Sequence, residues 1–238
     1  MALFQRKQHF LGIDIGTSSI KAVEISNTGG RPKLETFGYV ERSFDIIKSD
    51  NPQNQIALAT LLKQMLKQTR VSTQKVVAAL PSFAVFTSII SLPAMSEKDL
   101  LAAIRWEAKK FVPMPLEDMI LDWRILKNQG LSSKDAAASV NAKKGKGRDL
   151  KILLTAAPKT LVKRYLAVCK AADLQLVSLE TEAFALERSL IGNDPSPVLL
   201  IDIGANATDM SVIASGIPIL NRSIDVGGDA LTRAIMNS

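Results

Sequence analysis

The alternation of apolar and polar residues predicts that the chain opens with three strands and a helix. Phe10–Ile15 is a short apolar run, and Ile20–Ile25 alternates apolar with polar or charged residues after a turn, which is the pattern of a hairpin. Leu34–Val40 is typical of a third strand beyond the turn at Gly29-Gly30. Pro52–Gln68 places its apolar residues at helical spacing instead. The predicted order of this first part is therefore β-β-β-α.

The last part of the chain repeats this order. Val198–Ile203 predicts a strand, a small polar turn follows, and Ala207–Ala214 predicts the returning strand. Ile217–Ile224 predicts a third strand, and Gly227-Gly228-Asp229 starts a last helix that is cut off at Ser238. We expect the chain to be the front part of a longer protein.

Between these two parts the sequence predicts further strands and helices. Ser96 is a good helix N-cap with Asp99 three residues later, and an apolar helix face follows until Pro113. The other elements expected here are strands at Met119–Leu126 and Lys151–Ala157, a helix at Lys159–Ala172, a strand at Leu174–Leu179 and a helix at Thr181–Leu190.

One uncharged stretch, Val76–Ser96, is about long enough to span a bilayer. Pro81 and Pro93 would interrupt a spanning helix, and the many β-branched residues favour two buried strands joined at Pro81-Ser82. The sequence therefore predicts strands inside a soluble fold. A single cysteine and the lack of a cleavable leader pattern favour the cytosol.

The two predicted hairpins share a motif as well as an order of elements. Leu11–Ser19 and Leu200–Thr208 both run from a strand through Asp-Ile-Gly into a small polar turn and a second strand. Their separation is far longer than the repeat of a solenoid, whose period is about 20–50 residues. A half-domain built twice is the interpretation that this separation favours.

These residue types suit a phosphate chain gripped from both sides. A glycine at the turn lets backbone N–H groups approach phosphate oxygens, and Ser, Thr or Asn side chains add donors. An aspartate at the end of a buried strand can hold Mg²⁺ or its waters, which is the role expected of Asp14 and Asp202. The candidate phosphate-binding residues are Asp14, Gly16, Thr17, Ser18 and Ser19 in the first hairpin and Asp202, Gly204, Ala205, Asn206 and Thr208 in the second.

Three other side chains have two interpretations each. Lys21 either reaches a phosphate from the second strand or is solvated. His9 is expected as a surface residue at a strand start rather than a base or ligand, and Cys169 as a buried apolar residue rather than a reactive thiol. The sequence shows no Ser-His-Asp, Cys-His or paired metal-ligand spacing, and no residue stands out as the base that activates water.

The formal net charge of +7 is compatible with nucleic acid, an anionic membrane surface or simple solubility. Much of this charge lies between Lys127 and Lys151, where the only acids are Asp135 and Asp149. Because this stretch lacks apolar periodicity and interleaved aromatic residues, we expect a solvated mobile loop rather than a nucleic-acid site.

Both hairpins resemble the phosphate motifs of the actin-like ATPase superfamily, which includes actin, sugar kinases and the cell-division protein FtsA. Asp14–Lys21 looks like the first motif and Asp202–Asp209 like the second. Thr181–Leu190 is similar to the connecting helix, and Gly227-Gly228-Asp229 matches the turn after the second hairpin. The resemblance implies ATP and Mg²⁺ as cofactors, and it adds Lys21, Gly227 and Gly228 to the expected binding residues.

Within that superfamily the chain resembles the PilM family of type IV pilus assembly proteins. The likeness rests on Trp106–Pro115 with Asp122, which resembles a characteristic insert, and on Ile20–Glu24 in the opening strand. It implies a cytoplasmic protein that binds ATP, attaches to the cytoplasmic N-terminal tail of the inner-membrane protein PilN and helps to build the inner-membrane platform. Other platform proteins are further implied partners, nucleic acid is not, and self-association is left open.

The same resemblance implies an α/β fold made of duplicated β-β-β-α-β-α domains, actin-like and ribonuclease H-like. Residues 1–82 and 177–197 would form the first actin-like domain, residues 83–176 an inserted lobe as in FtsA, and residues 198–238 the incomplete start of a second domain.

Three functions remain open at this stage. The favoured one is a nucleotide-dependent switch, at most a slow ATPase, that lies beside the inner membrane through its partners. The alternatives are an FtsA-like membrane-associated filament scaffold and a small-molecule kinase of the same superfamily. Trp106, which lies off the apolar face of its helix, either anchors an interface or packs between lobes.

Overall fold

The computed structural model describes residues 8–42, 51–126 and 149–237. Contacts divide the chain into two compact units, one formed by Met1–Ala84 with Leu161–Ser238 and the other by Val85–Thr160. The basic stretch expected as a mobile loop lies mostly outside the described residues. The second unit is shorter than the inserted lobe expected at residues 83–176, and the division into actin-like domains stays a prediction.

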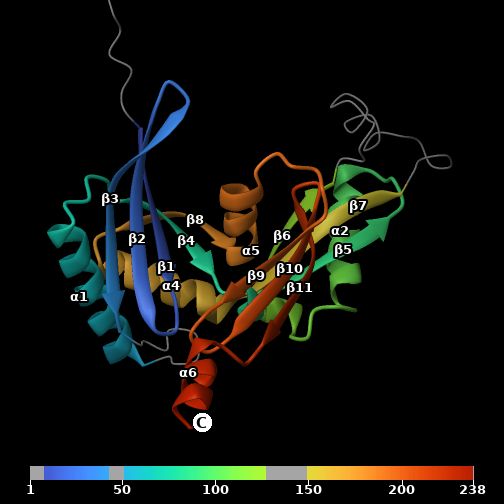
Figure 1. The fold of residues 1–238 in the computed structure, drawn as a ribbon. Coiled ribbons are helices and arrows are strands. Elements are labelled where there is room, and N and C mark those ends of the chain that lie inside the picture. Colours follow the sequence, from blue (N-terminus) through green and yellow to red (C-terminus); the bar gives the residue numbers. More distant parts are fainter. Residues whose placement is uncertain (1–7, 43–50, 127–148, 238) are drawn as a thin grey trace, which may run out of the picture. The chain divides into compact units, whose positions relative to one another are not determined.

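The first unit contains a five-stranded sheet in the order β3-β2-β1-β4-β8 (Figure 1). Its strands are β1 (Gln8–Ile15), β2 (Ser19–Thr28), β3 (Arg31–Glu41), β4 (Lys75–Leu80) and β8 (Gln175–Thr181). β2 pairs antiparallel with β1 and β3, whereas β4 pairs parallel with β1 and β8. Leu11, Ile13 and Ile15 are buried at alternate positions of β1, as the period of two requires. The predicted opening strands are therefore confirmed.

Helix α1 (Pro52–Gln68) lies against β3. It begins where the sequence predicts because the Asn51 side chain accepts a backbone amide bond at its N-terminus, and Pro52 occupies a position that needs no amide donor. Met65 of α1 packs over Gly38 of β3, where an added Cβ would lie 2.8 Å from Met65 Cγ. Glycine at position 38 therefore lets the helix approach the sheet closely.

The same unit holds a three-stranded antiparallel sheet in the order β11-β10-β9. Its strands are β9 (Val198–Ile203), β10 (Thr208–Ala214) and β11 (Ile217–Ile224), and α6 (Gly228–Met236) follows them. The order of the opening elements thus returns, as the repeated sequence pattern predicts.

The described part of the first unit has further helical segments, of which α4 begins two residues before the unit boundary at Leu161. They are α4 (Lys159–Ala171), α5 (Glu182–Leu186) and the short segment η1 (Ser82–Ala84). The expected single helix at 181–190 is divided, because α5 passes into a π-helical turn, η3 (Glu187–Ile191), that ends at Gly192. Both α5 and η1 contact β11.

In the described part of the second unit, a three-stranded antiparallel sheet packs on helix α2 (Glu97–Ala108). Its elements are β5 (Phe86–Leu92), α2 (Glu97–Ala108), η2 (Leu116–Asp118), β6 (Met119–Ile125) and β7 (Leu150–Pro158), with strand order β5-β7-β6. Leu100, Ile104 and Ala108 of α2 share one fully buried cluster with Ile152 and Leu154 of β7. Ser96 caps α2 as predicted, since its Oγ accepts the Asp99 amide at 3.3 Å.

The uncharged stretch predicted to form two strands does so, but the strands join different sheets. β4 pairs with β1 and β8 in the first unit, whereas β5 pairs with β7 in the second. The segment η1 lies between them, so the chain passes from one unit to the other just after it. In the described part of the chain, no helix is both long and apolar enough to cross a membrane.

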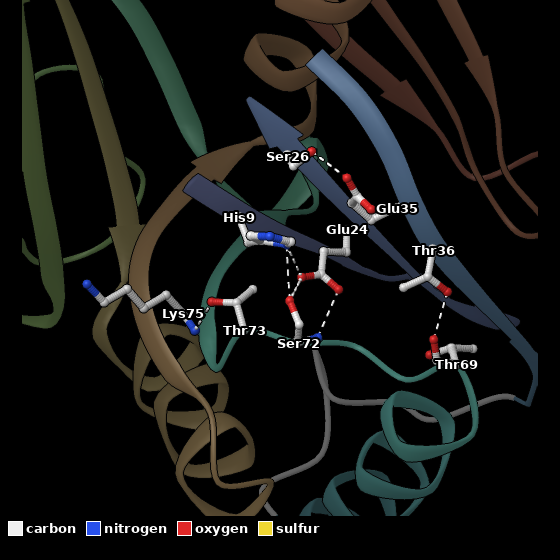
Figure 2. Close-up of polar contacts among 9 residues, drawn as sticks. All are labelled: His9, Glu24, Ser26, Glu35, Thr36, Thr69, Ser72, Thr73 and Lys75. Carbon is white, nitrogen blue, oxygen red and sulfur yellow. Dashed lines mark hydrogen bonds and ion pairs between the residues drawn. The ribbon is translucent and has the colours of Figure 1, made fainter. Parts of the chain in front are cut away.

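A buried acid fastens the connection between α1 and β4 to the sheet. Glu24 on β2 has only 1% of its surface exposed, and Figure 2 shows its carboxylate beside His9 and Ser72. The Oε1 atom lies 2.8 Å from His9 Nδ1 and accepts the Ser72 hydroxyl, while Oε2 accepts the Ser72 amide at 2.9 Å. His9, expected as a plain surface residue, is therefore half-buried and bonded to an acid.

These bonds decide the charge of Glu24. Burial by itself would raise the pKa of the carboxyl, but the hydrogen bonds from Ser72 and the neighbouring His9 outweigh it and hold the pKa below its ordinary value of 4.5. A further bond in Figure 2, from Thr36 Oγ1 to the Thr69 carbonyl at 2.8 Å, ties the end of α1 to β3. The network thus joins β1, β2 and β3 to the segment that leads into β4.

We predict that Glu24→Ala lowers the free energy of unfolding by about 1–3 kcal/mol at pH 7, because the Ser72 amide and hydroxyl lose their buried acceptor. Since the folded pKa lies below 4.5, this stabilisation is complete above that pH and is lost as the pH falls through the folded value. Urea unfolding of both proteins from pH 7 to about pH 3, which extends well below 4.5, measures the difference.

The matched control is Glu41→Ala, an exposed acid on β3, which should change stability by no more than about 0.5 kcal/mol. A gap between wild type and Glu24→Ala that stays constant as the pH falls would contradict a role for the carboxylate charge.

Candidate functional site

The turns of the two predicted hairpins line one cleft within the first unit. The turn after β1 contributes Gly16, Thr17 and Ser18, and the turn after β9 contributes Gly204 and Ala205. The rest of the lining comes from the strand ends, from η1 and from the start of α5, and includes Asp14, Ser19, Lys21, Pro81, Phe83, Glu182, Asp202 and Asp209. Two segments that are far apart in sequence thus contribute to the same site.

Both turns close in the same way. The Gly16 amide donates to the Ser19 carbonyl at 2.9 Å, and the Gly204 amide donates to the Ala207 carbonyl at 2.9 Å. A Cβ on Gly16 would lie 3.2 Å from the Ser19 oxygen, and a Cβ on Gly204 would lie 3.1 Å from the Ala207 oxygen. A side chain at either position would therefore crowd the turn, and the amide of each glycine is used within its own turn.

The amides that remain for a ligand are those that follow the glycines. Among the described residues, the N–H groups of Thr17, Ser18, Ala205 and Asn206 donate no hydrogen bond to the protein. Unpaired backbone N–H groups in a tight turn form a concave anion site. Three of these residues, Thr17, Ser18 and Ala205, also line the cleft, so their amides can be offered to an oxyanion there.

Lys21 brings a positive charge to the first hairpin. It stands opposite Asp14 on adjacent strands, and its Nζ lies 3.1 Å from Asp14 Oδ2. Partial burial lowers the pKa of Lys21, but the carboxylates of Asp14 and Asp202 outweigh this and raise it above its ordinary value. The lysine is thus charged, and it is exposed enough to be reached by a ligand in the cleft.

The second hairpin has an acid where the first has this lysine. Asp209 stands opposite Asp202 in the register of β9 and β10, just as Lys21 stands opposite Asp14. Burial raises the pKa of Asp209, and the Asp202 carboxylate adds to the rise. Within the described residues, the buried Oδ1 of Asp209 has no hydrogen-bond partner. This pair of carboxylates therefore favours a bound cation or a proton.

Glu182 adds a further acid at the first residue of α5. Its Oε2 accepts the Ser82 amide at 3.0 Å. Burial, followed by the charges of Asp14, Asp209 and Asp202, raises the pKa of Glu182 to about 7, against the opposing effect of the Ser82 bond. A carboxyl with this pKa can accept or release a proton near neutral pH, which is the property of a general acid or base.

Four of the predicted binding residues are not part of the cleft lining. Asn206 and Thr208 belong to the second hairpin, but the Thr208 hydroxyl donates to the Val226 carbonyl at 2.7 Å. Gly227 packs beneath the turn, where an added Cβ would lie 2.5 Å from the carbonyl oxygens of Gly204 and Ala205. Gly228 donates its amide to the Gly204 carbonyl at 2.9 Å. These two glycines hold the second turn in place, and their direct contact with a ligand stays a prediction.

Sequence reasoning missed two acids of the cleft. Glu182 lies in the predicted connecting helix, and the sequence gives no sign of its raised pKa. That pKa depends on burial and on three aspartates from other strands, which a single sequence does not show. Asp209 could have been found from register, since the spacing from Asp202 to Asp209 equals that from Asp14 to Lys21. Cys169, by contrast, is buried as predicted, and burial raises the pKa of its thiol to about 11.

No group of three or more His, Cys, Asp or Glu side chains in the described residues is arranged to hold a metal ion. A cation beside Asp14 and Asp202 would therefore take most of its ligands from water or from a bound molecule. This is the coordination that Mg²⁺ adopts near phosphates, and the predicted role of the two aspartates as Mg²⁺ ligands stays a prediction.

A family model described as type IV pilus assembly protein PilM matches residues 12–238. The chain is also similar to a chain in the structure of a PilM–PilN type IV pilus biogenesis complex, with 28% sequence identity and a TM-score of 0.77. This match covers 96% of the present chain and 65% of the other, so the chain spans less than two thirds of the length of that protein.

Two more distant structures share the fold. One is the cytoplasmic domain of EpsL, an inner-membrane component of the type II secretion system of Vibrio cholerae, at 10% identity and a TM-score of 0.53 over 92% of this chain and 71% of that one. The other is the ethanolamine utilization protein EutJ from Carboxydothermus hydrogenoformans, at 15% identity and a TM-score of 0.53 over 97% and 56%. Together with the PilM match, they bear out the expected mixed α/β fold of the actin-like ATPases over most of the chain.

We predict that one glutamate carboxyl, that of Glu182, titrates near pH 7, which carbon-13 NMR of glutamate-labelled protein can follow. Asp202→Asn should shift this titration to lower pH, because it removes one of the charges that raise it. Since the folded pKa lies above the ordinary value of 4.5, stability should fall as the pH rises from about 4.5 to 7, and Glu182→Gln should abolish that fall.

Glu117→Gln, an exposed acid of the second unit, is the control that should leave both curves unchanged. If no glutamate titrates above pH 6 in the wild type, the cleft does not bring these acids together as described.

Proposed function

Because the chain belongs to the PilM family of type IV pilus assembly proteins, we propose that it acts as a nucleotide-dependent assembly protein of the pilus inner-membrane platform. In this role it binds ATP with Mg²⁺, and the bound state changes its affinity for a partner at the membrane. The observation that carries the proposal is that two equivalent glycine turns line one cleft.

The residues present in the cleft are compatible with a nucleotide phosphate chain. Unpaired amides that line the cleft follow the glycine in each turn, those of Thr17 and Ser18 in the first and that of Ala205 in the second, and a Cβ on either glycine would crowd a backbone carbonyl. Lys21 adds an accessible ammonium between the aspartates of the two hairpins. Thr17 and Ser18 add hydroxyl donors beside the first turn.

The balance of charge in the cleft supports a divalent cation as part of the ligand. Among the described residues, four acids line it, Asp14, Glu182, Asp202 and Asp209, against one lysine, Lys21. A bare polyphosphate would be repelled by this excess of carboxylates, whereas Mg²⁺ neutralises charge on both sides and takes its ligands from phosphate, carboxylate and water. We assign Asp14 and Asp202 to the cation and the turn amides with Lys21 to the phosphates.

A hydrogen bond supports coupling between the cleft and the second unit. Glu182 and Phe83 both line the cleft, and Glu182 accepts the amide of Ser82. Two residues further on, after Ala84, the chain enters the second unit. A ligand that displaces Glu182 from this bond therefore acts directly on the segment from which the second unit begins, which is how differential contacts become a switch.

The partner that we propose is the cytoplasmic N-terminal tail of PilN, since the matched structure is a PilM–PilN complex. This interaction would place the protein on the cytoplasmic side of the inner membrane, held there by its partner. We propose that the protein hydrolyses ATP slowly at most. Glu182 is the candidate general base, because its pKa of about 7 lets it accept a proton near neutral pH.

We predict that the chain binds ATP only in the presence of Mg²⁺ and that Asp14→Ala and Asp202→Ala each weaken binding by about tenfold or more, because each removes a charged partner of the cation. Isothermal titration calorimetry with and without Mg²⁺ measures this. Asp118→Ala, an exposed acid in the second unit, should bind as the wild type does. Equal affinity for all three variants would exclude the phosphate assignment.

We further predict that ATP changes the affinity for a PilN tail peptide by about fivefold or more, and that Glu182→Ala removes this dependence. Glu182→Gln should retain it, because the amide oxygen of Gln can still accept the Ser82 N–H. Fluorescence anisotropy of a labelled peptide measures the affinity.

The tryptophans offer a second measurement of the same coupling. Trp106 and Trp123 both belong to the second unit, whereas the cleft belongs to the first. If ATP binding acts on the second unit through Glu182, it should change the tryptophan emission of the wild type but not that of Glu182→Ala. Unchanged emission and unchanged peptide affinity in a sample that binds ATP by calorimetry would rule out the switch and leave nucleotide binding intact.

A further inference from the structure

The outer face of α2 combines exposed apolar and basic side chains. Its inner face is fixed in the core of the second unit, where Leu100, Ile104 and Ala108 have no exposed surface. On the outer side Trp106 is 63% exposed and Leu101 is 50% exposed. A tryptophan this exposed on a helix contributes little to the core of its own unit, so the packing of the described fold does not account for so large an aromatic side chain at this position.

Basic residues surround this tryptophan. Lys98, Arg105 and Lys109 are exposed and form no ion pair within the described residues. Their positions, with those of Leu101 and Trp106, lie on the outward side of a helix whose buried residues are spaced three to four apart. The acids of α2 are Glu97 and Asp99 in its first turn and Glu107, which pairs with Lys110. The second half of the outward side, with Arg105 and Lys109, therefore carries positive charge and no unpaired acid among the described residues of α2.

A fourth cation is held against the indole itself. Lys110 Nζ lies 4.3 Å from the centre of the Trp106 ring and 2.8 Å from Glu107 Oε2. The cation–π contact and the ion pair limit the rotamers of both Trp106 and Lys110, so the indole is held at the surface with a charged group beside it. This arrangement, an apolar ring level with ammonium groups, is the one that membrane–water interfaces select.

We propose that the outer face of α2, defined by Lys98, Leu101, Arg105, Trp106 and Lys109, docks on an anionic lipid surface. The basic side chains attract acidic headgroups, and Trp106 with Leu101 enters the boundary between headgroups and acyl chains. Charge complementarity selects this partner: the face carries three unpaired cations and two apolar side chains, and a lipid surface offers negative charge and an apolar layer at once.

Nucleic acid matches the same face less well. Base stacking needs aromatic rings that are open on a flat side, and Lys110 already occupies one of the two faces of the Trp106 ring. Leu101 would also gain nothing from a phosphate backbone. This inference is independent of the nucleotide cleft and would hold if ATP did not bind.

The test is sedimentation of the full chain with vesicles of phosphatidylcholine alone or with phosphatidylglycerol added. The wild type should bind only the anionic vesicles, and Arg105→Ala and Lys109→Ala should each weaken binding by about fivefold. Trp106→Ala should weaken it further and remove the quenching of tryptophan emission by brominated acyl chains. Lys67→Ala, an exposed lysine of α1, is the matched control and should bind as the wild type does.

The basic stretch at 127–151 would also attract the protein to any anionic surface. Vesicle binding by the wild type alone is therefore not sufficient, and the comparison with the α2 variants decides the outcome. Equal vesicle binding by the wild type, Arg105→Ala and Trp106→Ala would overturn the proposal, and so would the absence of binding to anionic vesicles. The same variants titrated with duplex DNA address the alternative: a loss confined to DNA binding would also overturn it. Circular dichroism of each variant, and Trp106→Phe as a milder change, separate loss of binding from loss of fold.

Discussion

The geometry of the cleft depends on one small constraint, the hydrogen bond that closes each glycine turn. In both hairpins the glycine amide is bonded to the carbonyl three residues later, and no side chain can be added at the glycine without crowding that carbonyl. The bond fixes the direction of the next two amides, and these are the donors left without a protein partner. The aspartates, the lysine and the acids of the cleft are placed by the strands on either side of these turns.

The sequence predicted the local parts of this arrangement well. Strand alternation located β1 to β3 and β9 to β11, and Asn51, Pro52 and Ser96 marked the starts of α1 and α2. These features depend on neighbours a few residues apart, so a single sequence contains them. The likeness of the two Asp-Ile-Gly turns also led to the residues that line the cleft on both sides.

What the sequence could not supply depends on contacts between distant segments. The stretch Val76–Ser96 contains no signal for strand pairing. The sequence therefore could not show that β4 pairs with β8 in the first unit while β5 pairs with β7 in the second. The raised pKa of Glu182 arises from burial and from three aspartates on other strands. His9 looked like a surface residue because its partners, Glu24 and Ser72, come from β2 and from the segment before β4. The packing of Gly227 and Gly228 against the second turn also joins distant segments, and their expected contact with a ligand stays a prediction.

The packing of these two glycines has an electronic consequence. The carbonyls of Gly204 and Ala205 accept the amides of Gly228 and Asp229 at the N-terminus of α6, each at 2.9 Å. Each of these carbonyls shares its peptide group with one of the unpaired N–H groups, that of Ala205 or that of Asn206. A hydrogen bond to one end of a peptide group polarises the other end, so the positive pole of α6 is relayed through the turn and makes both N–H groups stronger donors. The first turn has a lysine beside it, and the second obtains comparable polarity from a helix that never enters the cleft.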